Sequence, residues 1–163
     1  MGINPTDFRH LVVRPTLEKL GRWSPSLENL LIGTAAQASG LGLQLKSDRG
    51  FGIYQLDAAL HQTVWDCFFA FDPDLASMVR GIASQREFLA NPHLELATNM
   101  SYATAIAWGV YAHSGATVPD DPDNVDKLAQ CWYQNFCQDL ALTPFHFITS
   151  YRKLVRRDNA KAA

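Results

Sequence analysis

The chain has 163 residues, of which 47% are hydrophobic and 18% are charged, and its formal net charge is −2. This composition excludes a disordered chain, and the near-neutral charge gives no basic field for nucleic acid. A length of 163 residues predicts one domain over residues 1–163. No membrane span or secretory signal peptide is recognisable, so we expect synthesis in a cytoplasm.

Helical patterns dominate the first half of the chain. A first helix is predicted from Thr6 to Leu20, and Pro15 is expected to kink or split it. Its predicted apolar stripe is Phe8, Leu11, Val12, Leu17 and Leu20. Ser24 and Pro25 are typical of a helix start and predict a second helix that runs to Ala38. Residues 39–51 are rich in glycine and predict a surface loop with room for a short β-hairpin.

The second half is also predicted to be helical. The expected helices cover residues 57–71, 75–83, 86–89, 95–113, 125–136 and about 143–156. The helix over 95–113 is the most apolar, and we expect it at the centre of the core; Asn124 or Asp123 should cap the helix over 125–136. The fold class is therefore mainly α, a single compact helical domain with minimal β structure.

The segment from Gly50 to Leu56, GFGIYQL, admits two interpretations. It can be a glycine turn followed by a helix start, with Ile53 and Leu56 in the core. Alternatively, Tyr54 and Gln55 line a groove, where a flat aromatic face and an amide offer the contacts that sugars require. Both interpretations remain open at this point.

Other polar residues are weaker candidates. His61 follows Asp57 by one helical turn, so the two either form a functional carboxylate–imidazole pair or make a structural contact. Trp132–Asn135 mixes aromatics and amides, typical of a segment that is half core and half groove. The histidines and the three cysteines have no metal-ligand spacing, and no cofactor fingerprint occurs, so no metal or cofactor is expected. A basic cluster at the end of the last helix is expected to be a solvated helix end, with a patch for an anionic polymer or partner as the alternative; its members are Arg152, Lys153, Arg156, Arg157 and Lys161, of which the last two lie outside the residues that the structure describes.

In order along the chain, four segments resemble the lysozyme-like superfamily, closest to its soluble lytic transglycosylase (goose-type lysozyme) branch and especially to small bacteriophage-encoded proteins of that type. The segments cover about residues 27–136. Ala35–Gly40 matches a helix that ends in glutamate-serine-glycine, and Gly52–Leu56 matches glycine-leucine-methionine-glutamine-isoleucine. Asn99–Tyr111 matches an asparagine that opens a long apolar helix ending in tyrosine. Ala129–Asn135 loosely matches an alanine-alanine-tyrosine-asparagine helix.

This resemblance implies a lysozyme-like α+β fold with a saccharide-binding cleft. It also implies cleavage of the β-1,4 bond between N-acetylmuramic acid and N-acetylglucosamine, with one glutamate as general acid. Substrate contacts are then expected at Ser39, Tyr54, Gln55, Asn99 and Tyr133, with Asp57, His61 and Asn135 as further candidates. The implied partner is the peptidoglycan glycan strand; a virion or host protein is a second candidate. Synthesis in a host cytoplasm and association with a virion would suit such a protein.

The chain departs from the family at its most important position. Ala38 stands where the general-acid glutamate belongs, and neither Gln37, Asp48 nor Asp57 occupies the motif position. Because losing a general acid typically costs about 10²–10⁴-fold in rate, the chain as written is expected to bind without cutting. Two explanations are open: an engineered substitution in an otherwise complete enzyme, or a natural non-catalytic relative that binds glycan, a small molecule or a host protein. A structural virion component is a third possibility.

Overall fold

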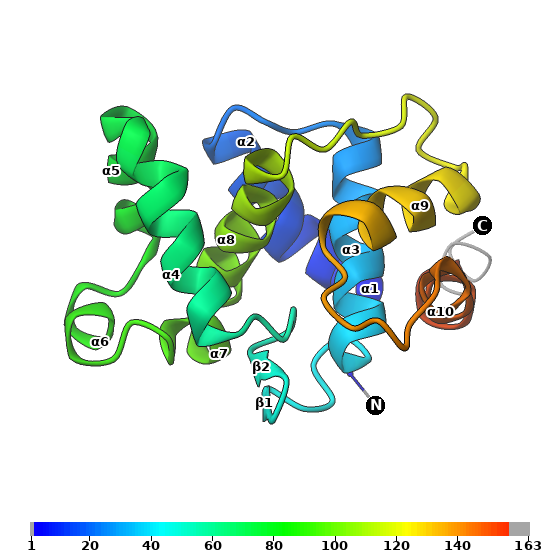
Figure 1. The fold of residues 1–163 in the computed structure, drawn as a ribbon, viewed down its shortest axis with the longest axis horizontal. Helices are drawn as coiled ribbons and strands as arrows, with labels where there is room; N and C mark the ends of the chain where they lie inside the picture. The colour runs from blue at the N-terminus through cyan, green and yellow to red at the C-terminus, as the bar shows by residue number, and fades with distance from the viewer. Residues whose placement is uncertain (1, 157–163) are drawn as a thin grey trace.

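Two helices, α3 (Pro25–Ser39) and α8 (Met100–His113), are buried along most of their length and form the centre of the molecule (Figure 1). The computed structural model describes residues 2–156 and shows a single compact helical domain. The position predicted for the apolar helix is therefore confirmed, although α3 shares the centre with it. None of the helices among the described residues is long and apolar enough to cross a membrane.

The N-terminal helical stretch contains a wide turn. It consists of α1 (Pro5–Phe8), the π-helical turn η1 (Arg9–Val13) and α2 (Arg14–Lys19), and the N–H of Arg14 donates to the carbonyl of Arg9. A π turn contains one residue more than a turn of regular α-helix. The wider turn accommodates the ring of Pro15, which would otherwise clash with a carbonyl group of the preceding turn. The predicted stripe is therefore wrong at Leu11, which is 73% exposed, because the extra residue rotates the side chains before the turn relative to those after it.

Helix α3 begins and ends where local chemistry predicts. The Ser24 hydroxyl accepts the N–H of Leu27 at 3.1 Å, and Pro25 occupies the first helical position. At the other end Gly40 takes a left-handed conformation with φ of 60°, and the following Leu41 does the same with φ of 59°. The chain therefore turns away directly after Ser39, which puts the end of α3 beside the loop that follows.

The loop after α3 carries the short antiparallel hairpin of β1 (Lys46–Ser47) and β2 (Gly50–Phe51). Phe51 pairs again with Leu56, so residues 50–56 form a compact turn. Gly52 has φ of 78°, and a Cβ placed there would lie 1.8 Å from the carbonyl oxygen of Leu96. Only glycine fits this position, because the turn packs directly against the backbone of the segment before α8.

The region between the hairpin and α8 is divided more finely than predicted. It contains α4 (Ala58–Cys67), η2 (Phe69–Phe71), α5 (Pro73–Ile82), α6 (Gln85–Ala90) and α7 (Glu95–Thr98). The single helix predicted over 95–113 is wrong, because Asn99 leaves helical geometry with ψ of 97°. Its side chain accepts the N–H of Tyr102 at 3.0 Å and so caps α8. Asn99 therefore stands at the start of the long apolar helix α8.

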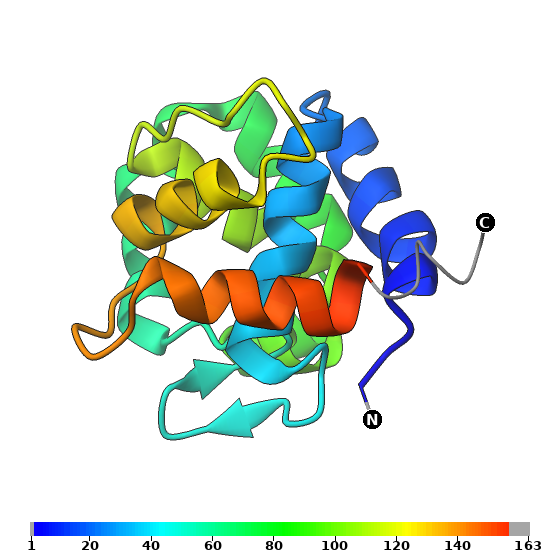
Figure 2. The same ribbon diagram turned by 90° about the vertical axis from the view of Figure 1, so that its right-hand side faces the viewer.

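The last two helices pack against α3. Helix α9 (Val125–Asn135) is capped by Asn124, and α10 (Pro144–Ser150) continues into the π-helical turn η3 (Tyr151–Val155). Figure 2 shows α10 crossing in front of α3. A Cβ at Gly33 would lie 2.3 Å from the Phe147 ring, so this glycine permits the close crossing.

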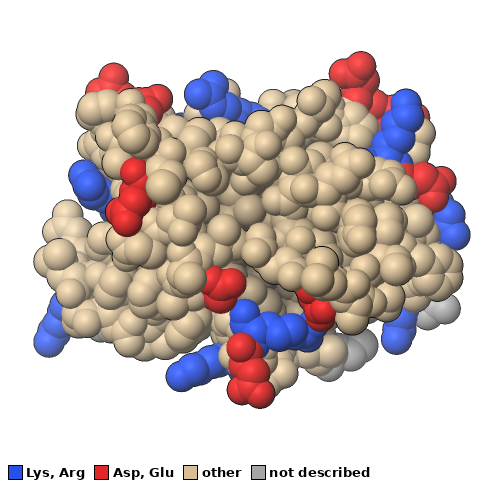
Figure 3. Space-filling model, viewed as in Figure 1, with Lys and Arg blue, Asp and Glu red and all other residues tan. Residues whose placement is uncertain are grey.

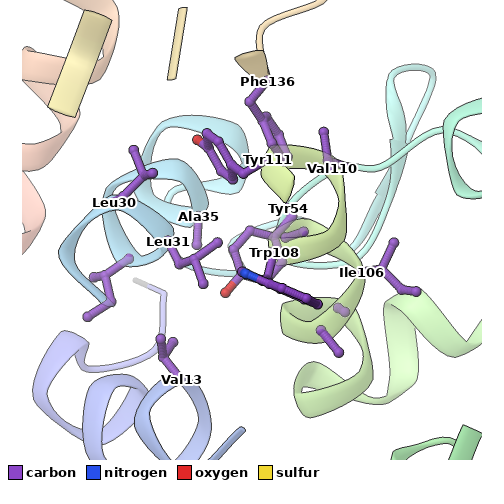
Figure 4. Packing of buried hydrophobic residues seen from close by; sticks show 14 of the residues in the cluster. Val13, Leu30, Leu31, Ala35, Tyr54, Ile106, Trp108, Val110, Tyr111 and Phe136 are labelled. Carbon is purple, nitrogen blue, oxygen red and sulfur yellow. The ribbon is translucent and has the colours of Figure 1, made fainter. Parts of the chain in front are cut away.

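Hydrogen-bonded tyrosines tie the core together between α3 and α8. Figure 4 shows Tyr54, Trp108 and Tyr111 lying between these two helices. The Tyr111 hydroxyl donates to Thr34, 2.7 Å away, because the hydroxyl of Thr34 is already used on the carbonyl of Leu30. Within residues 2–156, no buried side-chain hydroxyl lacks a hydrogen-bond partner, as a low-dielectric core requires.

Candidate functional site

A pocket of about 340 Å³ opens where the end of α3 meets the hairpin, the start of α4 and the end of α9. It is lined by Gln37, Ala38, Arg49, Tyr54, Gln55, Leu56, Asp57, Leu60, Trp132, Phe136, Cys137, Gln138, Asp139 and Leu142. Figure 3 shows acidic and basic side chains close together at the lower centre of one face, the part of the molecule that holds β1 and β2 in Figure 1. Four candidates from the sequence line this pocket, namely Ala38, Tyr54, Gln55 and Asp57.

Position 38 faces the pocket, whereas the next residue supports it. Ala38 lies in the last turn of α3 and is partly exposed within the lining. Ser39 is outside the lining; its hydroxyl donates to the carbonyl of Ile53 at 2.6 Å and accepts the N–H of Gly42 at 2.9 Å. Ser39 therefore fastens the end of α3 to the turn that forms the opposite wall.

Tyr54 and Gln55 contribute more to the walls than to open surface. Tyr54 is fully buried, and its hydroxyl lies 2.9 Å from that of Thr104; burial raises the pKa of this phenol far above its usual range. Gln55 has φ of 50°, and its amide donates both hydrogens, to the carbonyls of Gly52 and Gln44. Its carbonyl oxygen accepts from Ser47 and keeps one lone pair for a ligand.

Asp57 lines the pocket but does not pair with His61. Its carboxylate accepts the N–H of Leu60 at 2.6 Å and caps α4. The His61 ring instead lies near His93 and Tyr102, in a separate cluster. The functional carboxylate–imidazole pair considered from the sequence is therefore wrong, because helix capping holds Asp57 at the start of α4 and burial turns His61 inward.

Three other candidates lie outside the pocket. The Asn99 side chain is used in capping α8 and donates to Ile82 and Glu95. Tyr133 is 39% exposed and is not in the lining, whereas the preceding Trp132 is, because successive helical residues point about 100° apart. Asn135 accepts from Ser114 and donates to the carbonyl of Cys131, so its amide is used in local structure.

Several lining residues carry no signal in the sequence. Arg49 lies in the polar turn of the hairpin, and Phe136, Gln138 and Asp139 come from the segment after α9, which contains no motif. Only the pocket itself reveals them, since loops far apart in sequence meet there. Arg49 forms no salt bridge with the described residues, although two carboxylates, of Asp57 and Asp139, share its pocket.

The arrangement is suited to binding rather than to acid–base chemistry at position 38. The nearly buried rings of Trp132 and Phe136 form part of an apolar wall beside amides, carboxylates and one guanidinium, a mixture that can hold a ligand with apolar and polar faces. The methyl group of Ala38 carries no proton to donate. No group of three or more potential metal ligands occurs among the residues described. Comparison with family models, curated proteins and solved structures finds no match to this chain.

Proposed function

We propose that the pocket at Ala38 binds the glycan strand of peptidoglycan, and that the chain with alanine at this position binds the strand without cleaving it. The observation that carries the proposal is the place of residue 38. The position that matches the general acid of the lytic transglycosylase-type family lies in the lining of the pocket and not in the core. The glycine turn matching the second family motif forms the facing wall.

The chemistry of the lining supports a saccharide ligand. The apolar side of a pyranose ring can contact the apolar wall to which the nearly buried rings of Trp132 and Phe136 contribute, while hydroxyl and acetamido groups need hydrogen-bond partners. Gln37 and Gln138 offer amides, and Asp57 and Asp139 offer acceptors. A volume of about 340 Å³ lies at the lower end of the range for small-molecule sites and suits one or two sugar rings held in an open groove.

The same lining would suit a general acid if one were present. A carboxyl group at position 38 would lie in a pocket whose lining includes the apolar side chains of Trp132, Phe136 and Leu60, and partial removal from water favours its protonated form. That form is the one that donates a proton to a leaving glycosidic oxygen. The Ala38→Glu variant should therefore cleave peptidoglycan, with a gain of at least about 10²-fold over the parent.

The experiment compares Ala38→Glu with Gln37→Glu as a matched control. Both residues line the pocket, but they are successive residues on α3 and point about 100° apart. The assay is release of soluble muropeptides from purified cell walls, with folding checked by circular dichroism. Release by Ala38→Glu alone supports the proposal, and folded Ala38→Glu without any release contradicts the assignment of position 38 as the acid site.

Glycan binding by the unmodified protein, with alanine at position 38, is tested separately. The unmodified protein should sediment with insoluble peptidoglycan, and soluble glycan fragments should compete it off. Ala38→Trp fills the pocket and should abolish this sedimentation, whereas Ser77→Trp, an exposed position on α5, should leave it intact. Equal sedimentation of the two tryptophan variants would show that binding does not use this pocket.

A further inference from the structure

A second pocket, of about 360 Å³, lies where α4, α5 and α6 meet. Its lining includes Trp65 of α4, Arg80 of α5, Phe88 of α6 and His93 of the link between α6 and α7. The linings of the two pockets share no residue. In Figure 1 these three helices lie at the left, away from α9 and α10. A ligand in the second pocket would therefore leave the proposed glycan site free.

The aromatic wall of the second pocket is held in place by the core. Trp65 and Phe88 are both half-buried, so part of each ring remains accessible to a ligand. The indole nitrogen of Trp65 donates to the Tyr102 hydroxyl at 2.8 Å, and the ring of Phe88 packs edge-on against the same tyrosine, with centroids 5.7 Å apart. Because the indole N–H is already used, a ligand meets only apolar parts of these two rings.

A guanidinium group stands beside this wall. Arg80 is exposed on α5, and the central carbon of its guanidinium lies 5.3 Å from the centroid of the Trp65 ring. This cation–π contact holds the side chain in place and requires none of its N–H donors. Among the side chains that the structure describes, none forms a hydrogen bond or a salt bridge with the Arg80 guanidinium. Its donors are therefore available to a ligand.

The acidic side chain in the described lining does not neutralise Arg80. Asp66 accepts from the Gln62 amide through both carboxylate oxygens, each at 3.0 Å, and no salt bridge joins it to Arg80. The pocket thus offers a place for the negative charge of a ligand. A carboxylate suits this place, because its two oxygens match the parallel N–H groups of a guanidinium.

His93 adds a further polar atom to the lining. Its Nδ1 lies 2.9 Å from Nδ1 of His61, and its ring stacks on Phe51 with centroids 6.4 Å apart, so the ring is fixed from two sides. Its Nε2 has no hydrogen-bond partner among residues 2–156 and is not buried. This nitrogen can make a hydrogen bond to a polar group of a ligand.

We propose that the second pocket binds a small aromatic carboxylate, with its ring against Trp65 and Phe88 and its carboxylate on Arg80. The two rings are tilted by 52° to each other, with centroids 6.1 Å apart, so a third ring can meet them in the edge-to-face geometry that aromatic pairs prefer. The volume is at the lower end of the range for small-molecule sites and suits a ligand of one or two fused rings.

The test is a titration of ¹⁵N-labelled protein with indole-3-acetate, followed by NMR. A ligand of this size should bind with a dissociation constant of about 1 mM or lower. The indole N–H of Trp65 and the amides of residues 61–66 and 88–93 should shift to saturation, while the amides of Ala38 and Gln55 in the first pocket should not. Absence of saturable shifts up to about 10 mM, or shifts confined to the first pocket, would overturn the proposal.

Two analogues of the probe separate its charge from its aromatic ring, and they need no variant of the protein. Indole-3-acetamide keeps the ring without the charge and should bind at least about fivefold more weakly, because charge-assisted hydrogen bonds are the stronger ones. Cyclohexylacetate keeps the charge without the aromatic ring and should bind at least about twofold more weakly. An amide that binds as tightly as the acid would refute the role of charge, and equal binding of cyclohexylacetate would refute the preference for an aromatic ring.

A matched pair of variants tests the guanidinium itself. Arg80→Gln replaces an exposed residue on α5 and should weaken binding of indole-3-acetate at least about fivefold, with little effect on indole-3-acetamide. Arg152→Gln removes an exposed arginine from η3, which continues α10 on the other side of the molecule, and should leave both affinities unchanged. Binding of indole-3-acetate by Arg80→Gln with the affinity of the parent would contradict the proposed site.

Discussion

The hydroxyl of Ser39 and the carbonyl oxygen of Ile53 lie 2.6 Å apart, and this hydrogen bond joins the two walls of the candidate glycan pocket. Ser39 ends α3, and Ile53 lies in the turn after the hairpin. The serine also accepts the N–H of Gly42, so one side chain sets the path of the chain on both sides of the hairpin. Because Ser39 directly follows Ala38, its hydrogen bonds also hold Ala38 in the lining of the pocket.

Removing this hydroxyl should loosen the pocket without altering its lining. Ser39→Ala leaves the carbonyl of Ile53 and the N–H of Gly42 without their partner, which should lower the free energy of unfolding by about 1–2 kcal/mol. Ser77→Ala, an exposed serine on α5, should change it by less than about 0.5 kcal/mol. Urea denaturation of both variants checks the difference, and equal stabilities would show that the Ser39 contacts carry no net energy.

Gly52 should tolerate no side chain. Gly52→Ala forces an alanine into φ of 78° and puts its Cβ against the carbonyl of Leu96, so we expect a loss of at least about 3 kcal/mol. Gly81→Ala is the matched control, because a Cβ there meets nothing within 4 Å and α5 gains a better helix former. This control should stabilise the protein by about 0.5 kcal/mol. Thermal unfolding that shows similar effects for the two variants would contradict the close packing of the turn.

A buried carboxylate should make the fold sensitive to acid. Glu28 is 2% exposed and accepts from Arg9 at 2.6 Å, from Arg14 at 2.7 Å and from Trp23 at 3.1 Å, which ties the N-terminal stretch to α3. Burial acts to raise the pKa of Glu28, but the hydrogen bonds from Arg14, Trp23 and Arg9 outweigh burial and leave the pKa below its ordinary value. The unfolded chain then binds the proton first as the pH falls.

Stability from Glu28 should therefore be complete above the ordinary glutamate pKa, about 4.3, and be lost as the pH falls below it. Glu28→Gln leaves two guanidinium groups facing a neutral amide and should cost about 3 kcal/mol at pH 7, the lower end of the range because Arg14 is partly solvated. The measurement is denaturant unfolding of both proteins from pH 7 to pH 2. A gap between the two that persists unchanged at pH 2 would refute the assignment.

His61 should act in a different pH window. Its folded-state pKa of about 4 lies below the unfolded value of about 6.5, so the unfolded chain takes up a proton first as the pH falls through this interval. Stability should decrease between pH 6.5 and pH 4 by at most about 3 kcal/mol, since each tenfold change in a protonation constant is worth about 1.4 kcal/mol.

The variant His61→Gln isolates this effect. It should be less stable than the parent at pH 7, because the side chain loses its fit between Tyr102 and His93, but its stability should not fall between pH 6.5 and pH 4. Glu28→Gln keeps the histidine pair and should retain the fall in that interval. If His61→Gln and the parent lose stability in parallel there, another group is responsible.

The sequence by itself determined most of the helices and several of their ends. Period and capping residues act within a few residues, which is why Ser24 and Asn124 lie at the predicted boundaries and α3 ends within one residue of the predicted Ala38. The errors are of the same local kind. The π turn that exposes Leu11 and the break at Asn99 change a helix by a single residue, and an apolar pattern does not resolve such changes.

Only the tertiary structure decided how these helices build a site. The side chains of Ala38 and Trp132 face one pocket, whereas those of Tyr133 and Asn99 do not, because each orientation depends on which helix packs against which. The contact between His61 and His93 joins residues 32 positions apart and leaves no trace in local spacing. Hydrogen bonds and pockets formed by distant segments depend on how the helices pack. Local sequence patterns therefore do not predict them.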